Sequence, residues 1–302
     1  MSTTTRAVRA GRRTVRVHRP DKVLFPEDGL TKADLVAYYR SVAPFMLPQL
    51  RGRPLMLERH PDGIGGPRFM QKETPDSYPD WVHRAELAKE GGTVTHTVCD
   101  DTATLVHLAD QAAVTLHRWQ AKAARPHHPD RLVFDLDPVD DDFAPVRRAA
   151  HHLGDLLTAL KLPAGLMTTG SRGLHVVVAL DGRADFDEVR AFARDVAETL
   201  AAAHPAELTT AARKSARGDR LYLDVQRNGY AQTAVAPYSV RARPGAPVAT
   251  PMRWEQLDEP ATHARRWTVR DVLEQARSAP WNGDVTRPRA LGPARRRLDS
   301  PR

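Results

Sequence analysis

The pattern of apolar and polar positions divides the chain into short strands and amphipathic helices. Leu132 to Asp137 is predicted to be a strand, in which alternate side chains point to opposite faces. Asp135 and Asp137 therefore share one face, and Pro138 ends the pattern. Near the N-terminus, the capping box Thr31-Lys-Ala-Asp34 predicts a helix over 32–43 that Pro44 ends.

The same periodicities predict the other elements of the chain. The expected helices are 102–118 (capped by Asp101), 144–161 and 185–202, and the expected strands are 165–169, 174–180, 221–225 and 232–237. Residues 45–100 are rich in strand and turn signals. Strands and helices mix without strict alternation, which favours an α+β fold over a doubly wound sheet.

Composition is that of a soluble globular protein. The 302 residues are 41% hydrophobic and 27% charged, and no apolar run approaches the roughly 18 residues that a membrane span needs. The N-terminus lacks the apolar segment of a secretory signal, and the single cysteine, Cys99, excludes an internal disulfide and a cysteine-rich zinc module. We expect a cytoplasmic protein that does not associate with membranes.

The net charge of +8 is concentrated at the two ends of the chain. Residues 1–19 carry six arginines and no acid, residues 285–302 carry six arginines and one aspartate, and subtracting both from +8 leaves −3 for residues 20–284. The ends are therefore either nonspecific contacts to nucleic-acid phosphates or solvated, disordered segments.

The aspartate pair 135 and 137 is the first candidate for chemistry. Two carboxylates side by side repel each other unless a cation lies between them, and hard divalent ions such as Mg²⁺ and Mn²⁺ prefer these ligands. A lone Asp-x-Asp also occurs on exposed strand ends, so the motif alone does not separate a metal site from a solvated surface. The following aspartates 140–142 are expected to be a solvated loop or a helix N-terminus.

Two further features strengthen the metal hypothesis. The turn Thr169-Gly-Ser171-Arg172-Gly has two glycines around a hydroxyl and a guanidinium, and its backbone N–H groups are expected to face an anion. His175, on the strand after the turn, is either a structural histidine or a ligand contact. Asp224 lies inside an apolar strand, which is costly unless it is paired or metal-bound.

Together these parts indicate phosphoryl or nucleotidyl transfer, with carboxylates holding two cations and basic groups holding a triphosphate. Arginines 217, 220, 241 and 243 face either the triphosphate or solvent. An alternative is a phosphatase of the haloacid dehalogenase type, in which Asp135 is the nucleophile and Asp137 the general acid. That family places its motif near the N-terminus, and it leaves Arg172 and His175 without a role.

The three motifs resemble those of the archaeo-eukaryotic primase superfamily, and more closely the polymerase domain of bacterial ligase D and its stand-alone relatives. The resemblance covers most of 20–257. It rests on Asp135-Leu-Asp137, Thr169-Gly-Ser-Arg-Gly-Leu-His175, Asp224, Asp21-Lys-Val-Leu-Phe-Pro26, Arg51-Gly-Arg-Pro54, Phe69-Met-Gln-Lys72, Leu116-His-Arg-Trp119 and residues 233–247. Each motif alone is weak, and the combination is specific.

The resemblance implies a primase-like α+β core, with an RRM-like sheet and helices, and an N-terminal β-rich subdomain. The expected layout is a basic, disordered arm over 1–19, a primase-polymerase domain over 20–284 with its β-rich part at 45–100 and catalytic core at 101–257, and a basic tail over 285–302. The implied activity is template-directed extension of a DNA or RNA primer, filling gaps in end joining. The implied cofactors are two Mn²⁺ or Mg²⁺ ions.

The resemblance also assigns roles to individual residues. Asp135, Asp137 and Asp224 match the catalytic, metal-binding aspartates. The residues that match nucleotide contacts are His117, Thr169, Ser171, Arg172, His175, Arg217 and Arg241. Lys22 and Lys32 match a pair that holds a DNA 5′-phosphate, and Phe69 matches an aromatic that stacks on the template, for which a core position is the alternative.

The implied partners are DNA (primer–templates, gaps and ends), NTPs or dNTPs, Ku and a separate ATP-dependent DNA ligase, in a nucleoid-associated, cytoplasmic setting. Thr169 replaces the serine that is usual in the family, which keeps the hydroxyl and adds a methyl group. Glu58 stands where ligase D relatives often have lysine, which weakens the inferred 5′-phosphate pocket. Ala211 and Ala212 stand where relatives often have an acid. Residues 224–228, Asp-Val-Gln-Arg-Asn, differ from the ligase D form Asp-Trp-x-Gln-Asn and favour the stand-alone branch. A non-catalytic module that binds DNA ends is the alternative of a different class, and it needs no carboxylate triad.

Overall fold

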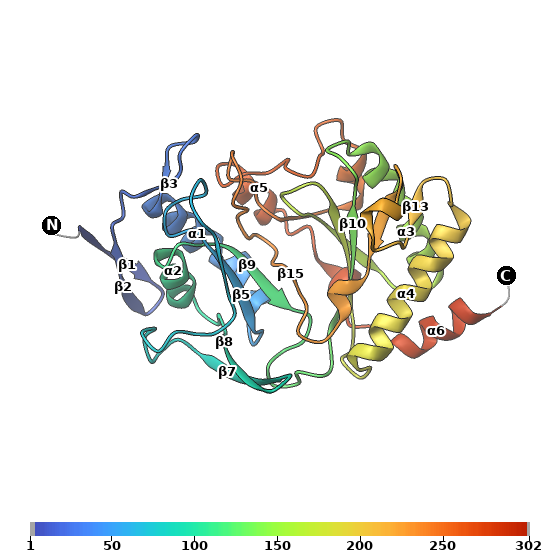
Figure 1. Cartoon of the computed structure of the whole chain (residues 1–302), viewed down its shortest axis with the longest axis horizontal. Helices are drawn as coiled ribbons and strands as arrows, with labels where there is room; N and C mark the ends of the chain where they lie inside the picture. Colours follow the sequence, from blue (N-terminus) through green and yellow to red (C-terminus); the bar gives the residue numbers. More distant parts are fainter. Residues whose placement is uncertain (1–3, 301–302) are drawn as a thin grey trace. The chain divides into compact units, whose positions relative to one another are not determined.

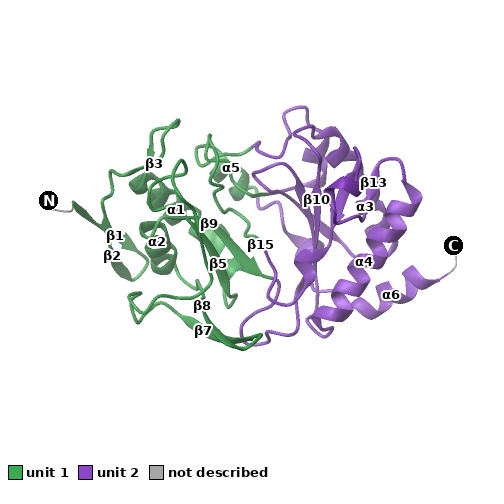
Figure 2. Ribbon diagram, in the orientation of Figure 1, with its two compact units in different colours: residues 1–119, 235–250, 267–278 green, residues 120–234, 251–266, 279–302 purple. Residues whose placement is uncertain are grey.

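The computed structural model describes residues 4–300, which divide into two units of mixed strands and helices (Figure 2). Unit 1 contains the described residues up to 119, together with 235–250 and 267–278. Unit 2 contains residues 120–234, 251–266 and the described residues from 279 onward. The expected α+β class is confirmed, because both units combine antiparallel strands with helices.

Unit 1 is built from short antiparallel sheets and three helices (Figure 1). Its elements are β1 (Thr5–Ala10), β2 (Arg13–His18), β3 (Val23–Phe25), β4 (Leu30–Thr31), α1 (Lys32–Leu50), β5 (Leu55–Arg59), β6 (Phe69–Gln71), β7 (Arg84–Lys89), β8 (Gly92–Thr97), α2 (Thr102–Asp110), β9 (Ala113–Trp119) and α5 (Val272–Arg277). β9, β5 and β6 are neighbours in one sheet, and β15 (Thr233–Val235), at the boundary between the units, is the fourth strand.

Helix α1 is longer than the sequence predicts. Its capping box forms as expected, since the Thr31 hydroxyl accepts from the Asp34 N–H and the Asp34 carboxylate accepts from the Thr31 N–H. The helix does not end at Pro44 but continues to Leu50. A proline inside a helix costs roughly 3 kcal/mol, and burying one large apolar side chain returns about 1.5–3 kcal/mol. Pro44 and Pro48 both lie inside α1, and burial of Met46, Leu47 and Leu50 stabilises the helix by an amount of the same order as the cost of the two prolines.

The predicted helix over 102–118 is wrong in its second half. Asp101 caps α2 as expected, but α2 ends at Asp110 and the chain continues as strand β9. Ala112, with φ of 55°, lies in the left-handed region between the two elements. A short, fully buried apolar run does not distinguish helix from strand, and here pairing with β5 decides for the strand.

The prediction of a disordered arm over 1–19 is wrong for the described residues. Strands β1 and β2 form a hairpin through Gly11, which has a φ of 59°. Val15 and Val17 are buried and the arginines between and around them are exposed, so the hairpin has one apolar face, and it contacts α2. The His18 N–H donates to Asp110 of α2 over 2.7 Å. Residues 1–3 lie outside the described part of the chain.

Unit 2 is organised around one sheet with the strand order β13-β14-β10-β12-β11-β16. Its elements are β10 (Arg131–Asp137), α3 (Ala144–Ala159), β11 (Ala164–Thr168), β12 (Leu174–Ala179), α4 (Phe186–Ala203), β13 (Leu208–Thr209), β14 (Leu221–Asp224), β16 (Thr250–Met252) and α6 (Leu291–Asp299). All but β13, β16 and α6, which match none of the predicted elements, lie close to a predicted element. The expected basic tail over 285–302 contains α6, and its last two residues lie outside the described part.

The central strand β10 separates an apolar face from an acidic one. Leu132, Phe134 and Leu136 are at most 1% exposed, whereas Asp135 and Asp137, on the alternate positions, are only partly buried. Helices α3 and α4 pack against each other and both contact β10 (Figure 1). The apolar face is therefore the one that the helices cover, and the carboxylates lie on the face away from them.

Within residues 4–300, none of the helices combines the length and hydrophobicity that crossing a lipid bilayer requires.

Candidate active site

Three adjacent strands bring two carboxylates and a histidine into one row. Asp135 on β10 is in register with Asp224 on β14 and with His175 on β12. Side chains directly opposite each other in an antiparallel pair have Cβ atoms only about 4.5–5.5 Å apart. Asp137 lies two residues further along the same face of β10, so the structure brings together all three aspartates that the sequence singles out.

Three arginines surround the carboxylates. Arg227 contacts two of them, with Nε 3.3 Å from Asp135 Oδ2 and Nη2 3.9 Å from Asp224 Oδ2. The other two contact Asp137: Arg172 Nη2 lies 3.6 Å from Asp137 Oδ1, and Arg217 Nη1 lies 3.4 Å from Asp137 Oδ2. Three clustered negative charges repel one another, and these guanidinium groups offset that repulsion.

Burial and charge affect the aspartates in opposite ways. Burial alone raises the pKa of Asp135, but His175, whose Nε2 is 3.5 Å from Asp135 Oδ1, and Arg227 outweigh it and lower the pKa to about 2. Burial raises the pKa of Asp224, the Gln226 N–H opposes this, and the charges of Asp135 and Asp137 raise it further. The Gln226 N–H and Arg227 offset only part of this increase, so the pKa of Asp224 stays raised while that of Asp135 is lowered, and an added cation would stabilise the ionised form of Asp224.

The donor set fits hard divalent cations. Asp135, Asp137 and Asp224 offer only oxygen atoms, on one face of a sheet, and their mutual repulsion favours a bound positive charge. Mg²⁺ and Mn²⁺ prefer such ligands, whereas zinc and copper sites usually include imidazole or thiolate.

Asn228 supports the strand that carries the pair. β14 ends at Asp224, and beyond it the Asn228 side chain, 0% exposed, continues the ladder by accepting from the Val133 N–H and donating to the Val133 carbonyl over 2.8 and 2.7 Å. The 3₁₀ turn Gln226–Asn228 places Asn228 there and brings Arg227 back to the carboxylates.

The turn after β11 does not present its backbone as expected. The Ser171 and Gly173 N–H groups donate to the Thr169 hydroxyl, and the Gly170 N–H donates to the Ala264 carbonyl. The Thr169 hydroxyl donates to the Gly173 carbonyl over 2.9 Å, so it closes the turn from inside and is 6% exposed with the rest of the residue. The prediction that these N–H groups face an anion is wrong, because the threonine side chain accepts two of them.

Gly173 and His175 are held tightly against β10. A Cβ on Gly173 would lie 2.1 Å from the Leu136 carbonyl oxygen, a distance that no other residue type allows. His175 is 3% exposed and its observed contact is with Asp135. Ser171 and Arg172, both half-buried, are the side chains of this turn that remain accessible.

Arg217 is fixed by backbone carbonyls that the sequence could not assign. It donates to the carbonyls of Ala211 and Ala212 over 3.1 and 2.8 Å, and its guanidinium lies 3.9 Å from the centre of the Tyr222 ring. These contacts hold the Arg217 guanidinium next to Asp137. The two alanines therefore act through their main chain, for which their side-chain identity matters little.

The remaining predicted residues belong to unit 1. His117 on β9 lies beside Glu58, which also contacts His60; the Glu58 carboxylate is 3.8 Å from His117 Nε2 and 3.2 Å from His60 Nε2. The nearby His117 imidazole, and then the hydrogen bond with His60, lower the pKa of Glu58 far below its ordinary value. Glu58, which stands where relatives often have lysine, therefore contacts His117 and His60. The ion pairs of Lys22 and Lys32 are instead with Asp62 and Asp110. Arg241, half-buried, follows Val240 in the segment that returns to unit 1.

Lys22 and Lys32 differ in their surroundings. Lys22 is paired with the exposed Asp62 over 2.7 Å. Lys32 is buried, with Nζ 3.4 Å from Asp110 Oδ1, and burial lowers its pKa although Asp110 opposes the shift. Phe69 is 54% exposed, which excludes the alternative of a core position.

Sequence reasoning missed Arg227 and Asn228 as parts of this site. Both lie in the segment 224–228, which differs from the ligase D form of the motif. Their spacing from Asp224 was visible, but their contacts depend on the 3₁₀ turn that follows β14.

Comparison with known proteins gives matches over most of the chain. The family model described as LigD, primase-polymerase domain, matches residues 31–281. The polymerase domain from Mycobacterium tuberculosis ligase D, solved in complex with DNA, superposes with a TM-score of 0.83 at 34% identity, covering 87% of this chain and 94% of that domain.

Two full-length relatives are similar over the same region. The multifunctional non-homologous end joining protein LigD of Mycolicibacterium smegmatis is 35% identical over 265 residues, which are 86% of this chain and 35% of the relative. The bifunctional non-homologous end joining protein LigD of Bacillus subtilis is 31% identical over 257 residues, 84% of this chain and 41% of the relative. The chain thus spans well under half the length of these relatives.

Proposed function

We propose that this chain, which belongs to the LigD primase-polymerase domain family, is a template-directed nucleotidyltransferase that extends DNA or RNA primers and fills gaps at DNA breaks. The observation that carries the proposal is the row of Asp224, Asp135 and Asp137 on one face of the sheet, with basic side chains around it. Three carboxylates are the ligands that two-metal phosphoryl transfer uses.

The carboxylates would hold the cations in this proposal. Asp135, Asp137 and Asp224 would hold two Mn²⁺ or Mg²⁺ ions, and these would supply Lewis-acid activation of the primer hydroxyl and neutralisation of the leaving pyrophosphate. His175 keeps Asp135 ionised and oriented, a role supported by its burial and its 3.5 Å contact. The low pKa of Asp135 supports metal binding at neutral pH, because the ionised form is the ligand.

The side chains around the carboxylates hold the nucleotide. Arg172 and Arg217 lie beside Asp137 and can donate charge-assisted hydrogen bonds to phosphate oxygens. The Ser171 hydroxyl is the neutral donor of the same turn, and Thr169 shapes that turn from inside. His117 and Arg241 complete the nucleotide contacts that the family resemblance implies.

DNA contacts involve a second set of residues. The exposed Phe69 offers a surface for stacking on an unpaired template base. Lys22 is the accessible member of the pair proposed to hold a downstream 5′-phosphate, since Lys32 is buried against Asp110. The solved relative is a complex with DNA and the full-length relatives are named for end joining, which supports the same substrate here. Ku and a separate DNA ligase are the proposed protein partners.

A matched pair of variants tests the function. The wild-type protein is incubated with a gapped primer–template, Mn²⁺ and NTPs or dNTPs, beside Asp224→Asn and Asp219→Asn. Removing a metal ligand is expected to lower the extension rate at least about 100-fold, since each 1.36 kcal/mol lost in the transition state is tenfold. Asp219 is an exposed aspartate five residues earlier, and its replacement is expected to leave the rate unchanged.

Absence of template-dependent extension by the wild-type protein would refute the polymerase proposal. Equal extension by wild type and Asp224→Asn would instead refute the metal assignment. The phosphatase alternative is not favoured, because it assigns no role to the Asp224 and His175 neighbours of Asp135.

A further inference from the structure

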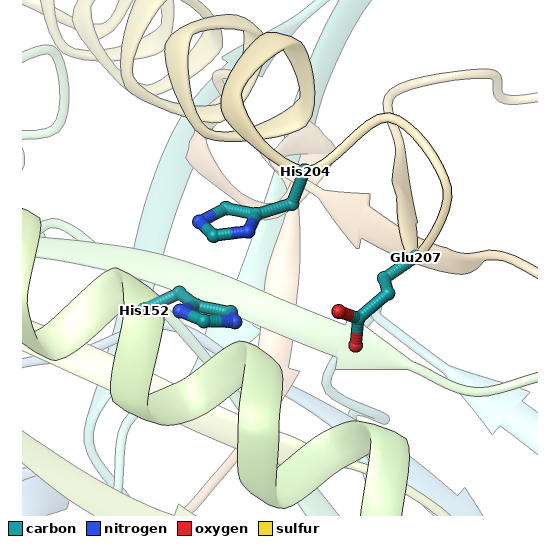
Figure 3. A group of neighbouring side chains, drawn as sticks. All are labelled: His152, His204 and Glu207. Atoms are coloured by element: carbon teal, nitrogen blue, oxygen red, sulfur yellow. The ribbon is translucent and has the colours of Figure 1, made fainter.

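Two histidines and a glutamate gather in unit 2 on elements that do not carry the catalytic carboxylates. His152 lies on α3, His204 caps the C-terminal end of α4, and Glu207 lies in the turn before β13 (Figure 3). One potential ligand atom from each of the three lies within 4.8 Å of the others. None of these residues takes part in the proposed polymerase chemistry.

The backbone fixes two of the three residues in one turn. The His204 N–H donates to the Leu200 carbonyl, which closes α4, and the His204 carbonyl accepts from the N–H groups of Glu207 and Leu208 over 3.1 and 3.0 Å. His204 and Glu207 are therefore held three residues apart on a hydrogen-bonded turn. Only His152 comes from a different element.

The two imidazole rings lie face to face. Their centroids are 3.7 Å apart and their planes differ by 20°. In Figure 3 the Glu207 carboxylate points toward the two rings. Burial, and then the neighbouring His204 ring, lower the pKa of His152, which favours its neutral form. A neutral imidazole exposes a nitrogen lone pair, which is the form that binds metals.

A hollow with room for an ion and its water lies beside the rings. It has a volume of about 340 Å³ and is lined by His152 and His204 together with Asp155, one helical turn after His152, and by apolar residues such as Leu156 and Leu200. The Glu207 carboxylate accepts from Arg148 Nε over 2.7 Å through Oε2. This ion pair lowers the pKa of Glu207, so the carboxylate is ionised.

We propose that His152, His204 and Glu207 form a second metal site, which binds a borderline transition cation such as Zn²⁺ and links α3 to the turn after α4. The argument is the donor set: two imidazoles and one carboxylate match the ligands of zinc sites, in which water takes the fourth position. Mg²⁺ and Mn²⁺ prefer oxygen donors, so the two sites of unit 2 select different ions. Binding requires each ring to turn until its nitrogen lies about 2.0–2.1 Å from the metal.

Calorimetric titration of the full chain with Zn²⁺ tests the site. The variants are His152→Ala/His204→Ala, Glu207→Gln and, as a matched control, His151→Ala, which removes the neighbouring histidine that pairs with Asp258 instead. Removing both imidazoles is expected to weaken one Zn²⁺ site by about 100-fold or more, because even outer-shell partners of a metal commonly contribute 10–100-fold. Glu207→Gln is expected to weaken it by roughly tenfold and His151→Ala to leave it unchanged.

Arg148→Gln gives a test with the opposite sign. It removes a positive charge from beside Glu207, so Zn²⁺ is expected to bind several-fold more tightly, an effect that general damage to the fold would not produce. Co²⁺ in place of Zn²⁺ supplies a visible absorption band that is expected to disappear in the double histidine variant and to persist in Asp224→Asn.

Circular dichroism without metal checks that each variant folds. Glu207 is exposed, so Glu207→Gln provides the comparison if the double variant does not fold. Equal Zn²⁺ stoichiometry and affinity in the wild-type protein and in the folded histidine or Glu207→Gln variants would overturn the proposal. A Co²⁺ band absent from Asp224→Asn but kept in the histidine variant would overturn it as well, because the ion would then occupy the catalytic carboxylates.

Discussion

Arg227 occupies the place where a cation is expected. Its guanidinium bridges Asp135 and Asp224, which belong to the proposed metal ligands, so it competes with a metal ion for the same negative charge. We therefore expect Arg227→Gln to bind Mn²⁺ more tightly, by about 1 kcal/mol or roughly fivefold, the low end for a partly exposed charge 4 Å away. Electron paramagnetic resonance of free Mn²⁺ measures this affinity without any turnover.

A second measurement separates competition from damage. Without metal, Arg227→Gln is expected to unfold at a lower temperature than the wild-type protein, because the carboxylates lose a counter-charge. Arg183→Gln, at an arginine whose side chain is 86% exposed, is the control and should change neither quantity. Weaker Mn²⁺ binding by Arg227→Gln would show that the arginine supports the metal instead of competing with it.

Glu58 gives unit 1 a pH-dependent contribution to stability. His117 and His60 lower its pKa in the folded protein, so its ionised form favours folding. That contribution is complete above the unfolded pKa of about 4.3, declines as the pH falls below it, and is fully lost only when the pH falls through the much lower folded pKa. Glu58→Gln is expected to cost about 1–3 kcal/mol at pH 6–7, the range for hydrogen bonds to a charged group, and a smaller amount near pH 3, which lies between the folded and the unfolded pKa.

Urea denaturation of wild type and Glu58→Gln at both pH values checks this expectation. Glu86→Gln serves as the control, because Glu86 is an exposed glutamate on β7 for which no burial effect is expected. A Glu58→Gln deficit that stays constant between pH 7 and pH 3 would mean that shape, and not charge, is what the position requires.

Helix α1 begins with a lysine whose structural and binding roles can be separated. Lys32 faces Asp110 of α2, which is buried and also accepts from the His18 N–H of the hairpin. Lys32→Ala leaves that carboxylate without its ammonium partner and is expected to destabilise unit 1 by about 3 kcal/mol, the low end for a broken buried pair, since His18 still donates.

Lys22→Ala is the informative variant for DNA binding. Its ion pair with Asp62 is exposed, so stability is expected to change little, while any preference for a 5′-phosphorylated gap should fall. Denaturation curves together with binding of gapped DNA with and without the 5′-phosphate make the measurement. An unchanged preference in Lys22→Ala would remove this residue from the proposed phosphate pocket.

The long elements of unit 2 around the carboxylates could be predicted because each has a local signal. β10, β12 and β14 show apolar runs, α4 shows a capping box at Asp185, and α3 shows helical periodicity. The convergence of Asp135 and Asp137 followed from the period of a strand alone. That Asp224 lies opposite Asp135 depends on strand pairing between residues far apart in the sequence, which periodicity does not specify.

The failures have the same cause. In the apolar stretch after Asp101, helix and strand bury similar side chains, and only the pairing of β9 with β5 decides where the helix ends. The arginine-rich N-terminus has too few apolar residues to indicate a core, yet Val15 and Val17 suffice once α2 offers a surface. The Thr169 hydroxyl could accept from the N–H groups of its own turn or leave them free for a ligand, and the sequence does not distinguish these hydrogen-bonding patterns.

The charge distribution of the protein leads to a prediction about its affinity for DNA. The six arginines within residues 1–19 have no acidic neighbour in that segment, and all of them are exposed around the β1–β2 hairpin. In α6, by contrast, Arg295 is paired with Asp195. The hairpin is therefore the less compensated of the two basic ends, and the stronger candidate for binding phosphates.

Charge-neutralising variants test this better than truncation, because removing residues 1–19 would also remove the buried side chains of the hairpin. We expect Arg6→Gln/Arg9→Gln/Arg16→Gln to reduce the slope of log K against log salt for gapped DNA by about 0.9 for each phosphate that the protein no longer neutralises. Arg296→Gln/Arg297→Gln, at exposed positions of α6, should reduce it less. Fluorescence anisotropy between about 50 and 200 mM salt measures both slopes. Equal slopes in the hairpin variant and the wild-type protein would mean that these arginines do not contact DNA phosphates, and that the protein binds DNA through other charges.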